Sequence, residues 1–162
     1  MHYAPFIMAV TFAAFGCCTA ADQSWAKTKA VQAVASPAEK PKTHRVIIQV
    51  TQNDPAVMNM ALNNAENLMG YFEEKGEPLE IEVVAFGAGL SMMRDDTSPV
   101  KDRLAGLSAK KGITFSGCQN TLGKQSLMEK KQISLVPQAR LVSAGIARVV
   151  ELEEQGWTYV RP

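Results

Sequence analysis

The residue whose type and position most clearly suggest chemistry is Cys118, in the run GCQNT at residues 117–121. The apolar run before it predicts a buried strand over residues 113–116, and the residues after it predict a short helix to about Lys131. Backbone N–H groups and the dipole at a helix start favour a thiolate over a thiol. Such a thiolate is a nucleophile toward sulfane sulfur and can hold it as a persulfide that a partner thiol removes. The alternative is a buried cysteine that packs as a small apolar side chain, and the sequence leaves both interpretations open.

Several other kinds of site are excluded by what the sequence lacks around Cys118. Beyond the first 21 residues the chain has one cysteine and one histidine, and His44 stands at the start of a predicted strand. A catalytic triad or a Cys-His pair needs a base beside the nucleophile, and a zinc site needs more ligands than these two residues supply. Residues 85–89 (AFGAG) lack the third glycine of a dinucleotide fingerprint and the Gly-Lys-Ser/Thr of a phosphate loop. We therefore predict no metal site and no bound cofactor.

Composition limits the function classes further. The chain has 162 residues, which suits one domain, and 46% of them are hydrophobic, which is enough for a substantial core. Its 17 Lys and Arg residues almost balance its 16 Asp and Glu residues. Without a large basic field the chain is not expected to bind nucleic acid.

The elements that must position Cys118 alternate between strands and helices. Asp54 as N-cap and Pro55 at the first helical position begin an amphipathic helix that ends near Gly76. A second helix opens at residues 98–99, and Ser143 is expected to cap a last helix that ends at Gln155. This alternation predicts an α/β fold, with a mainly parallel five-stranded sheet and helices on both faces. The strands are expected at residues 44–50, 79–86, 113–116, 139–142 and 157–160.

Ligands of such sheets bind beyond the carboxyl ends of the strands, and this edge supplies the predicted binding residues. Besides Cys118, the segments that meet there are residues 51–54 and 87–92. The two glycines in the second segment can alternatively form a tight strand-to-helix turn. The polar residues after Cys118 can alternatively cap the helix. The binding residues predicted at this edge are Asn53, Gly87, Gly89, Asn120 and Thr121.

The N-terminal part of the chain is expected to lie outside the domain. Residues 1–21 contain a short apolar run followed by small residues, which is typical of a cleaved signal peptide, and residues 22–42 resemble a flexible spacer. Removal of the signal would leave an exported, periplasmic protein with no membrane-spanning segment and with Cys118 as its one cysteine. Two alternatives remain: lipidation at Cys17, which would give a membrane-anchored lipoprotein, and a retained anchoring segment.

Several segments together resemble a known family. The segments are HRVIIQVTQNDP, ALNNAENL, IEVVAFGAGLSMM, GCQNT and GWTYVRP. Similar segments occur in this order and at similar spacing in DsrE/DsrF-like proteins, in particular the small exported members described as sulfur oxidation proteins. The resemblance covers residues 43–162 and implies a flavodoxin-like or Rossmann-like domain that assembles as a homotrimer or hexamer. It also implies that Cys118 carries sulfur as a persulfide. The loop of this subgroup reads Cys-Gly-Asn-Thr, so Gln119 stands here in place of a glycine.

The sequence thus favours a sulfur carrier or sulfurtransferase that holds sulfane sulfur on Cys118 and passes it to a partner thiol, either a carrier protein or a small sulfur compound. One alternative is a non-catalytic module for small-ligand binding or oligomeric assembly, with a structural cysteine. Another is a redox sensor that forms an intermolecular disulfide through Cys118.

Overall fold

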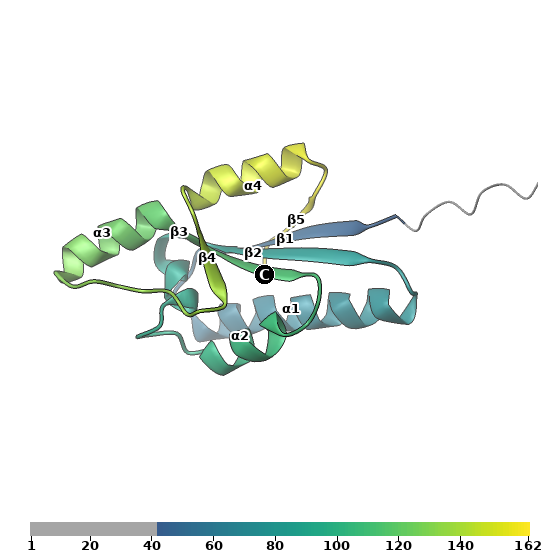
Figure 1. Cartoon of the computed structure of the whole chain (residues 1–162), viewed down its shortest axis with the longest axis horizontal. Helices are drawn as coiled ribbons and strands as arrows, with labels where there is room; N and C mark the ends of the chain where they lie inside the picture. The colour runs from purple at the N-terminus through teal and green to yellow at the C-terminus, as the bar shows by residue number, and fades with distance from the viewer. Residues whose placement is uncertain (1–41) are drawn as a thin grey trace, which may run out of the picture. The chain divides into compact units, whose positions relative to one another are not determined.

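The computed structural model describes residues 42–162, which form a five-stranded sheet with all neighbouring strands parallel (Figure 1). The strand order across the sheet is β4-β3-β2-β1-β5. This confirms the predicted α/β fold of flavodoxin-like or Rossmann-like type. The strands are β1 (His44–Val50), β2 (Leu79–Ala85), β3 (Ile113–Cys118), β4 (Ala139–Val142) and β5 (Thr158–Val160).

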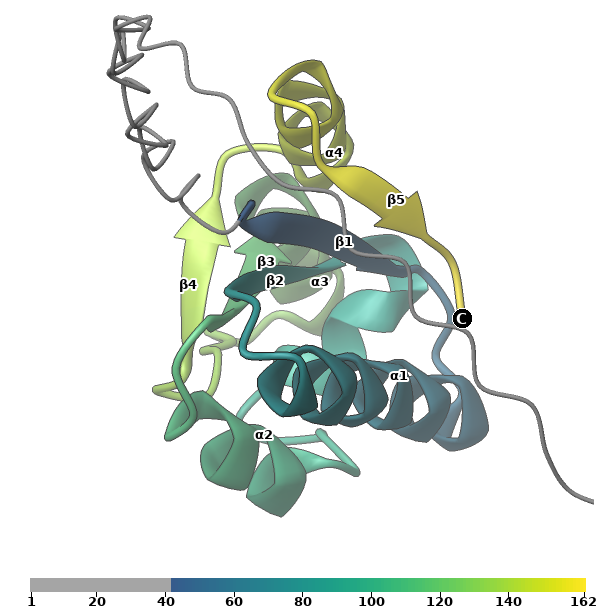
Figure 2. The same cartoon turned by 90° about the vertical axis from the view of Figure 1, so that its right-hand side faces the viewer.

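Helices cover both faces of the sheet because the central strands are apolar on both sides. Ile47 and Ile48 are adjacent on β1, and their side chains enter different cores because successive side chains alternate between faces. The core under Ile48 is the larger one and lies against the helices α1 (Pro55–Glu74) and α2 (Lys101–Ser108). The core around Ile47 is closed by α4 (Gly145–Glu154) on the opposite face (Figure 2). Each such fully buried side chain stabilises the fold by about 1.5–3 kcal/mol.

The helix start predicted after β1 is confirmed by the cap geometry. Asp54 has an extended backbone, and its carboxylate accepts a hydrogen bond of 2.8 Å from the N–H of Ala56, while Pro55 is the first helical residue. The chain therefore turns directly from the carboxyl end of β1 into α1. The ladder between β1 and β2 runs without a break from His44 and Leu79 to Val50 and Ala85, so the carboxyl ends of these strands lie side by side.

Three boundaries differ from the sequence prediction, and each difference has a local cause. The 3-10 helix η1 (Gly87–Met93) follows β2 where a turn was expected, and its last five residues are buried. The helix after it begins at Lys101 rather than at residues 98–99, with Val100 as its N-cap, and the Ser98 hydroxyl donates to the carbonyl of Met92 while accepting from the N–H of Val100. Ala144, and not Ser143, is the N-cap of α4 and supplies no side-chain hydrogen bond.

One helix does not cover the sheet. The helix α3 (Gln119–Glu129) begins directly at the end of β3, has no buried residue and extends away from the carboxyl edge of the sheet (Figure 1). The predicted signal peptide at residues 1–21 and most of the predicted spacer at 22–42 lie outside the residues that the structure describes. Among residues 42–162 no helix has the length and apolar character required to cross a membrane.

Candidate functional site

Cys118 lies where β3 becomes α3. It is the last residue of the strand and also the N-cap of the helix, with the extended backbone typical of that position. Its Sγ accepts a hydrogen bond of 3.4 Å from the N–H of Thr121, as the oxygen of a capping serine would. The residue is 5% exposed, whereas Gln119 and Asn120 beside it are exposed. The sulfur therefore lies just beneath the surface at the carboxyl edge of the sheet.

A second helix start also reaches this sulfur. The backbone N–H of Gly145, the first residue of α4, favours the thiolate of Cys118, as do the N–H groups of Thr121 and Asn120. Burial by itself raises the pKa of the Cys118 thiol. The hydroxyl of Thr121 and these three N–H groups outweigh burial, so the pKa of Cys118 lies below its ordinary value. The thiolate is favoured by donors from two helices, whereas the sequence indicated only one.

The position of Gly145 depends on the absence of a side chain. A Cβ atom added there would lie 2.7 Å from Cβ of Phe86, which is closer than side-chain carbons approach. Glycine thus lets the start of α4 pack against the end of β2 and brings its N–H to Sγ. Sequence reasoning missed Gly145. The signal that it offered was a glycine two residues after the predicted cap at Ser143.

Of the predicted binding residues, Thr121 and Gly87 lie next to Cys118. The N–H of Gly87 donates a hydrogen bond of 3.1 Å to Oγ1 of Thr121, and this hydroxyl lowers the pKa of Cys118. Gly87 has a φ of 57°, a left-handed conformation that glycine adopts without strain. Its carbonyl accepts a hydrogen bond from the side-chain amide of Gln125 on α3. Gly87 therefore orients the threonine hydroxyl and ties α3 to the end of β2.

The remaining predicted residues have other surroundings. The side chain of Asn120 is exposed, and its contribution to Cys118 is its backbone N–H. Gly89 lies where an added Cβ would be 2.3 Å from the carbonyl oxygen of Val50, so it allows close packing and not ligand approach. The Asn53 side chain accepts a hydrogen bond of 2.6 Å from Ser91 and borders a separate cavity of about 430 Å³.

A buried arginine fastens α3 to the segment after β2. Arg94 is 5% exposed and forms paired hydrogen bonds with both oxygens of Asp96 and both oxygens of Glu129, near the end of α3. The Arg94 guanidinium, together with Lys131, holds the pKa of Glu129 down to about 2 and that of Asp96 well below its usual range. We call this group, with Gln125, the Arg94 clamp, because α3 has no buried side chain of its own. No pattern in the sequence indicates that Arg94 is buried.

A second ionic cluster lies on the face of the sheet that α4 covers. Glu82 on β2 is 2% exposed and accepts hydrogen bonds from Ser116 on β3, at 2.6 Å, and from Arg148 on α4, at 2.8 and 2.9 Å. Arg140 on β4 completes the cluster, with its Nη2 2.9 Å from the same carboxylate. Burial raises the pKa of Glu82, but hydrogen bonds from these three residues outweigh burial and lower it. The only sequence signal was the run LEIEVVA, in which Glu82 stands with Glu80 among apolar residues.

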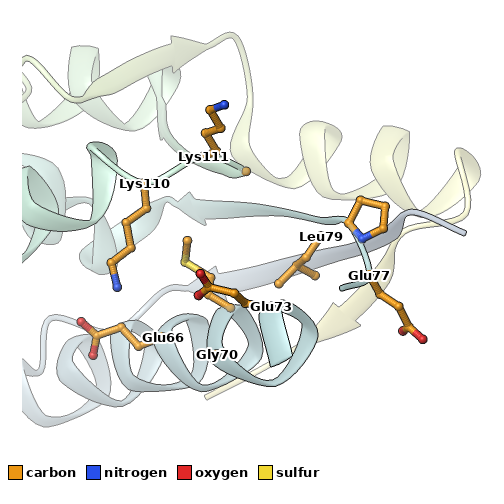
Figure 3. Close-up of a pocket in the computed structure, with 10 residues that line it drawn as sticks. Glu66, Gly70, Glu73, Glu77, Leu79, Lys110 and Lys111 are labelled. Carbon is orange, nitrogen blue, oxygen red and sulfur yellow. The ribbon is translucent and has the colours of Figure 1, made fainter. Parts of the chain in front are cut away.

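Another cavity, of about 580 Å³, lies at the opposite edge of the sheet (Figure 3). Its lining includes Leu79, the first residue of β2, and Gly112, which precedes β3. Glutamates of α1 face Lys110 across it, while Lys111 points away (Figure 3). These residues begin the strands, whereas Cys118 ends one, so this cavity is separate from the thiol site.

Comparison with known proteins supports the fold and adds no activity. No family model and no curated protein matches the chain. A solved structure described as a protein of unknown function, MTH1491 from Methanobacterium thermoautotrophicum, is similar, with 28% sequence identity and a TM-score of 0.63. The similarity covers 74% of this chain and 99% of that one. The chain is thus similar over the whole length of this archaeal protein, with which it shares the α/β fold.

Proposed function

We propose that the protein is a sulfur carrier of DsrE/DsrF-like type, in which Cys118 holds sulfane sulfur as a persulfide and passes it to a partner thiol. The observation that carries the proposal is the position of Cys118 as the N-cap of α3, where Sγ accepts a hydrogen bond from the N–H of Thr121, while the N–H of Gly145 at the start of α4 also lowers its pKa. Such donors stabilise negative charge on sulfur, which both the thiolate and the terminal sulfur of a persulfide carry near neutral pH.

Loading and unloading are the same exchange run in two directions. In loading, the Cys118 thiolate attacks a sulfane sulfur of a polysulfide, a bond forms from Sγ to that sulfur, and the rest of the polysulfide leaves with the electron pair. In unloading, a partner thiolate attacks the outer sulfur, and the pair returns to Sγ. A lowered thiol pKa favours both directions, because it supplies the attacking thiolate in the first and a good leaving group in the second.

Intact mass spectrometry tests this proposal. We expect the purified protein to gain the mass of one sulfur atom after incubation with polysulfide, and to lose it on treatment with a thiol. The Cys118→Ser variant should gain nothing under the same conditions. The starting mass also shows whether residues 1–21 are removed and whether a lipid is attached, which tests the predicted export to the periplasm. A wild-type mass that stays constant, together with a thiol that a small alkylating reagent does not reach, would show a structural cysteine.

A second candidate function is oligomeric assembly without chemistry, and exposed apolar side chains favour it. On α3, Leu127 is 80% exposed and Met128 is 82% exposed. Leu141 on β4 and Ile146 on α4 are also half exposed. Large apolar side chains in such positions often belong to protein interfaces. We propose on this basis that the protein associates with itself, as the resemblance implies, and assembly is compatible with sulfur transfer.

A further inference from the structure

A cavity of about 340 Å³ lies between the edge strand β4 and the helix α4. Its wall on one side is residues 140–144, and on the other it is the face of α4 that carries Ala147, Arg148 and Glu151. We call it the β4–α4 cavity. A volume of a few hundred Å³ is that of a small-molecule site. No side chain caps the start of α4, so its positive end borders this space without a carboxylate or hydroxyl of its own.

The charges in the β4–α4 cavity favour an anion at one end. Arg140 and Arg148 both line it and share the single buried carboxylate of Glu82. Arg148 uses Nε and Nη2 on Glu82 and reaches Glu151, a 58% exposed rim residue, only at 3.5 Å. Arg140 is different. Its Nε donates to Ser116 and its Nη2 forms an ion pair with Glu82 at 2.9 Å, while Nη1 makes no hydrogen bond or ion pair with residues 42–162, and 52% of its side chain is exposed.

Arg140 lies two residues before the β4 residue that pairs with Cys118. The ladder between β3 and β4 pairs Ser116 with Arg140 and Cys118 with Val142. Arg140 and Val142 are two residues apart and share a face of the sheet, about 7 Å apart along the strand. The cavity lining includes residues 142–144, so the cavity reaches the point at which β4 pairs with Cys118. Cys118 pairs with Val142, which lines the cavity, and Arg140, which also lines it, lies two residues earlier on β4.

We propose that the β4–α4 cavity binds the carboxylate of a small thiol, which takes the sulfur from Cys118. The inference rests on the proposed function and names the class of its acceptor: a thiol carboxylate of the size of an amino acid or short peptide. The planar fork of an arginine matches a carboxylate, and the distance along β4 then places the thiol of the same molecule near Cys118. The chain thereby binds a soluble acceptor directly, without a carrier protein.

The transfer step balances without any further reactant. The acceptor thiolate attacks the outer sulfur of the Cys118 persulfide, and a new bond between the acceptor sulfur and this outer sulfur forms. The bond from the outer sulfur to Sγ breaks, and its electron pair returns to Sγ. The sulfane sulfur changes carrier, and no electrons are gained or lost overall.

The first test compares two acceptors that differ only in the carboxylate. Protein loaded with polysulfide is desalted and mixed with mercaptopropionate or with its alcohol counterpart mercaptopropanol, and unloading is followed by intact mass. We expect the ratio of the two rate constants to be roughly tenfold higher in the wild type than in Arg140→Gln, because one charge-assisted contact is lost. The control is Arg45→Gln, which removes an arginine of similar exposure, 46%, that is also paired with a glutamate, Glu80. Its ratio should equal that of the wild type, and equal ratios in all three proteins would overturn the inference.

A second test does not depend on sulfur transfer or on the folding of one variant. The Cys118→Ser protein is titrated with S-methyl mercaptopropionate, which binds without reacting, and backbone amide signals are followed by NMR. We expect shifts confined to residues 140–148, weakened in a second variant, Arg140→Lys, which keeps the charge and loses the planar fork. If Cys118 never takes up sulfur, the proposed function fails, but this titration still tests whether the β4–α4 cavity binds a carboxylate. Unmoved signals at residues 140–148 would exclude the proposed site.

Discussion

At the scale of the residue, the sulfur of Cys118 is bound as an anion would be bound. The donors around it are backbone N–H groups and one hydroxyl, and Gly87 holds that hydroxyl in place by donating to the Thr121 oxygen. A buried apolar cysteine needs no such set of donors. The arrangement therefore supports a role for the thiolate and not only for the volume of the side chain.

Thr121→Val is expected to raise the pKa of Cys118, because it removes the hydroxyl and keeps the shape and the backbone N–H. At neutral pH, alkylation of the thiol should slow by roughly tenfold, the value of one hydrogen bond to a charged group. The pH profile of alkylation, read against thiolate absorbance, measures the change. Asn120→Ala is the matched control, since Asn120 acts through its backbone N–H and its side chain is exposed. An unchanged profile in Thr121→Val would show that the hydroxyl does not bind Sγ.

The lowered pKa also has a consequence for stability. A thiol whose pKa is lower in the folded than in the unfolded state stabilises the fold above the unfolded pKa, and the contribution is lost as pH falls through the folded pKa. The free energy of unfolding should therefore rise with pH over the interval between the two. Removing the Thr121 hydroxyl raises the pKa of Cys118 in the folded state, and this narrows the pH interval over which the free energy of unfolding rises.

At the scale of the element, the start of α4 is as important for the site as the start of α3. Gly145→Ala is expected to destabilise the protein by about 1–3 kcal/mol, because the new methyl group meets Phe86 and α4 must move. The same movement withdraws the N–H of Gly145 from Sγ and raises the pKa of Cys118. Denaturant unfolding and the alkylation profile measure the two effects.

The control for this prediction is a helical glycine with open space around it. Gly70 lies inside α1, and a Cβ added there meets nothing within 4 Å. Gly70→Ala should therefore stabilise the helix by about 1 kcal/mol and leave the thiol unchanged. If Gly145→Ala were as stable as the wild type and its thiol equally reactive, α4 would have no part in the site.

The elements themselves were largely predictable, because they follow from local patterns. The apolar runs gave the strands, and Asp54 with Pro55 gave the start of α1, since cap chemistry depends on neighbours in the sequence. The start of α4 was predicted one residue early, because a serine favours a cap and Ala144 shows no such preference. Three features could not be predicted, because they join residues far apart in sequence and no local pattern indicates them. They are the contribution of α4 at Cys118, the Arg94 clamp and the Glu82 cluster.

At the scale of the whole molecule, the proposed self-association can be tested at the exposed apolar residues of α3. We expect the protein to sediment as an oligomer, and replacement of Leu127 and Met128 together by lysine to weaken association by roughly tenfold or more, because apolar side chains at an interface lose their contacts and a charge is buried. Analytical ultracentrifugation over a concentration series measures this. The control is Met60→Lys, which introduces the same charge at a 48% exposed methionine on α1. A wild-type chain that is monomeric at all concentrations would contradict the prediction.

The position of β1 in the sheet has a consequence for how the molecule folds. β1 has β2 on one side and β5 on the other, and Tyr159 of β5 donates a hydrogen bond to Gln49 of β1 across 110 residues of sequence. Contacts between such distant segments carry a high loop-closure entropy and form late. Until β5 docks, one edge of an apolar strand stays open to pairing with other chains. Aggregation during refolding is therefore expected to compete with this last docking step, and dilution should favour the native sheet.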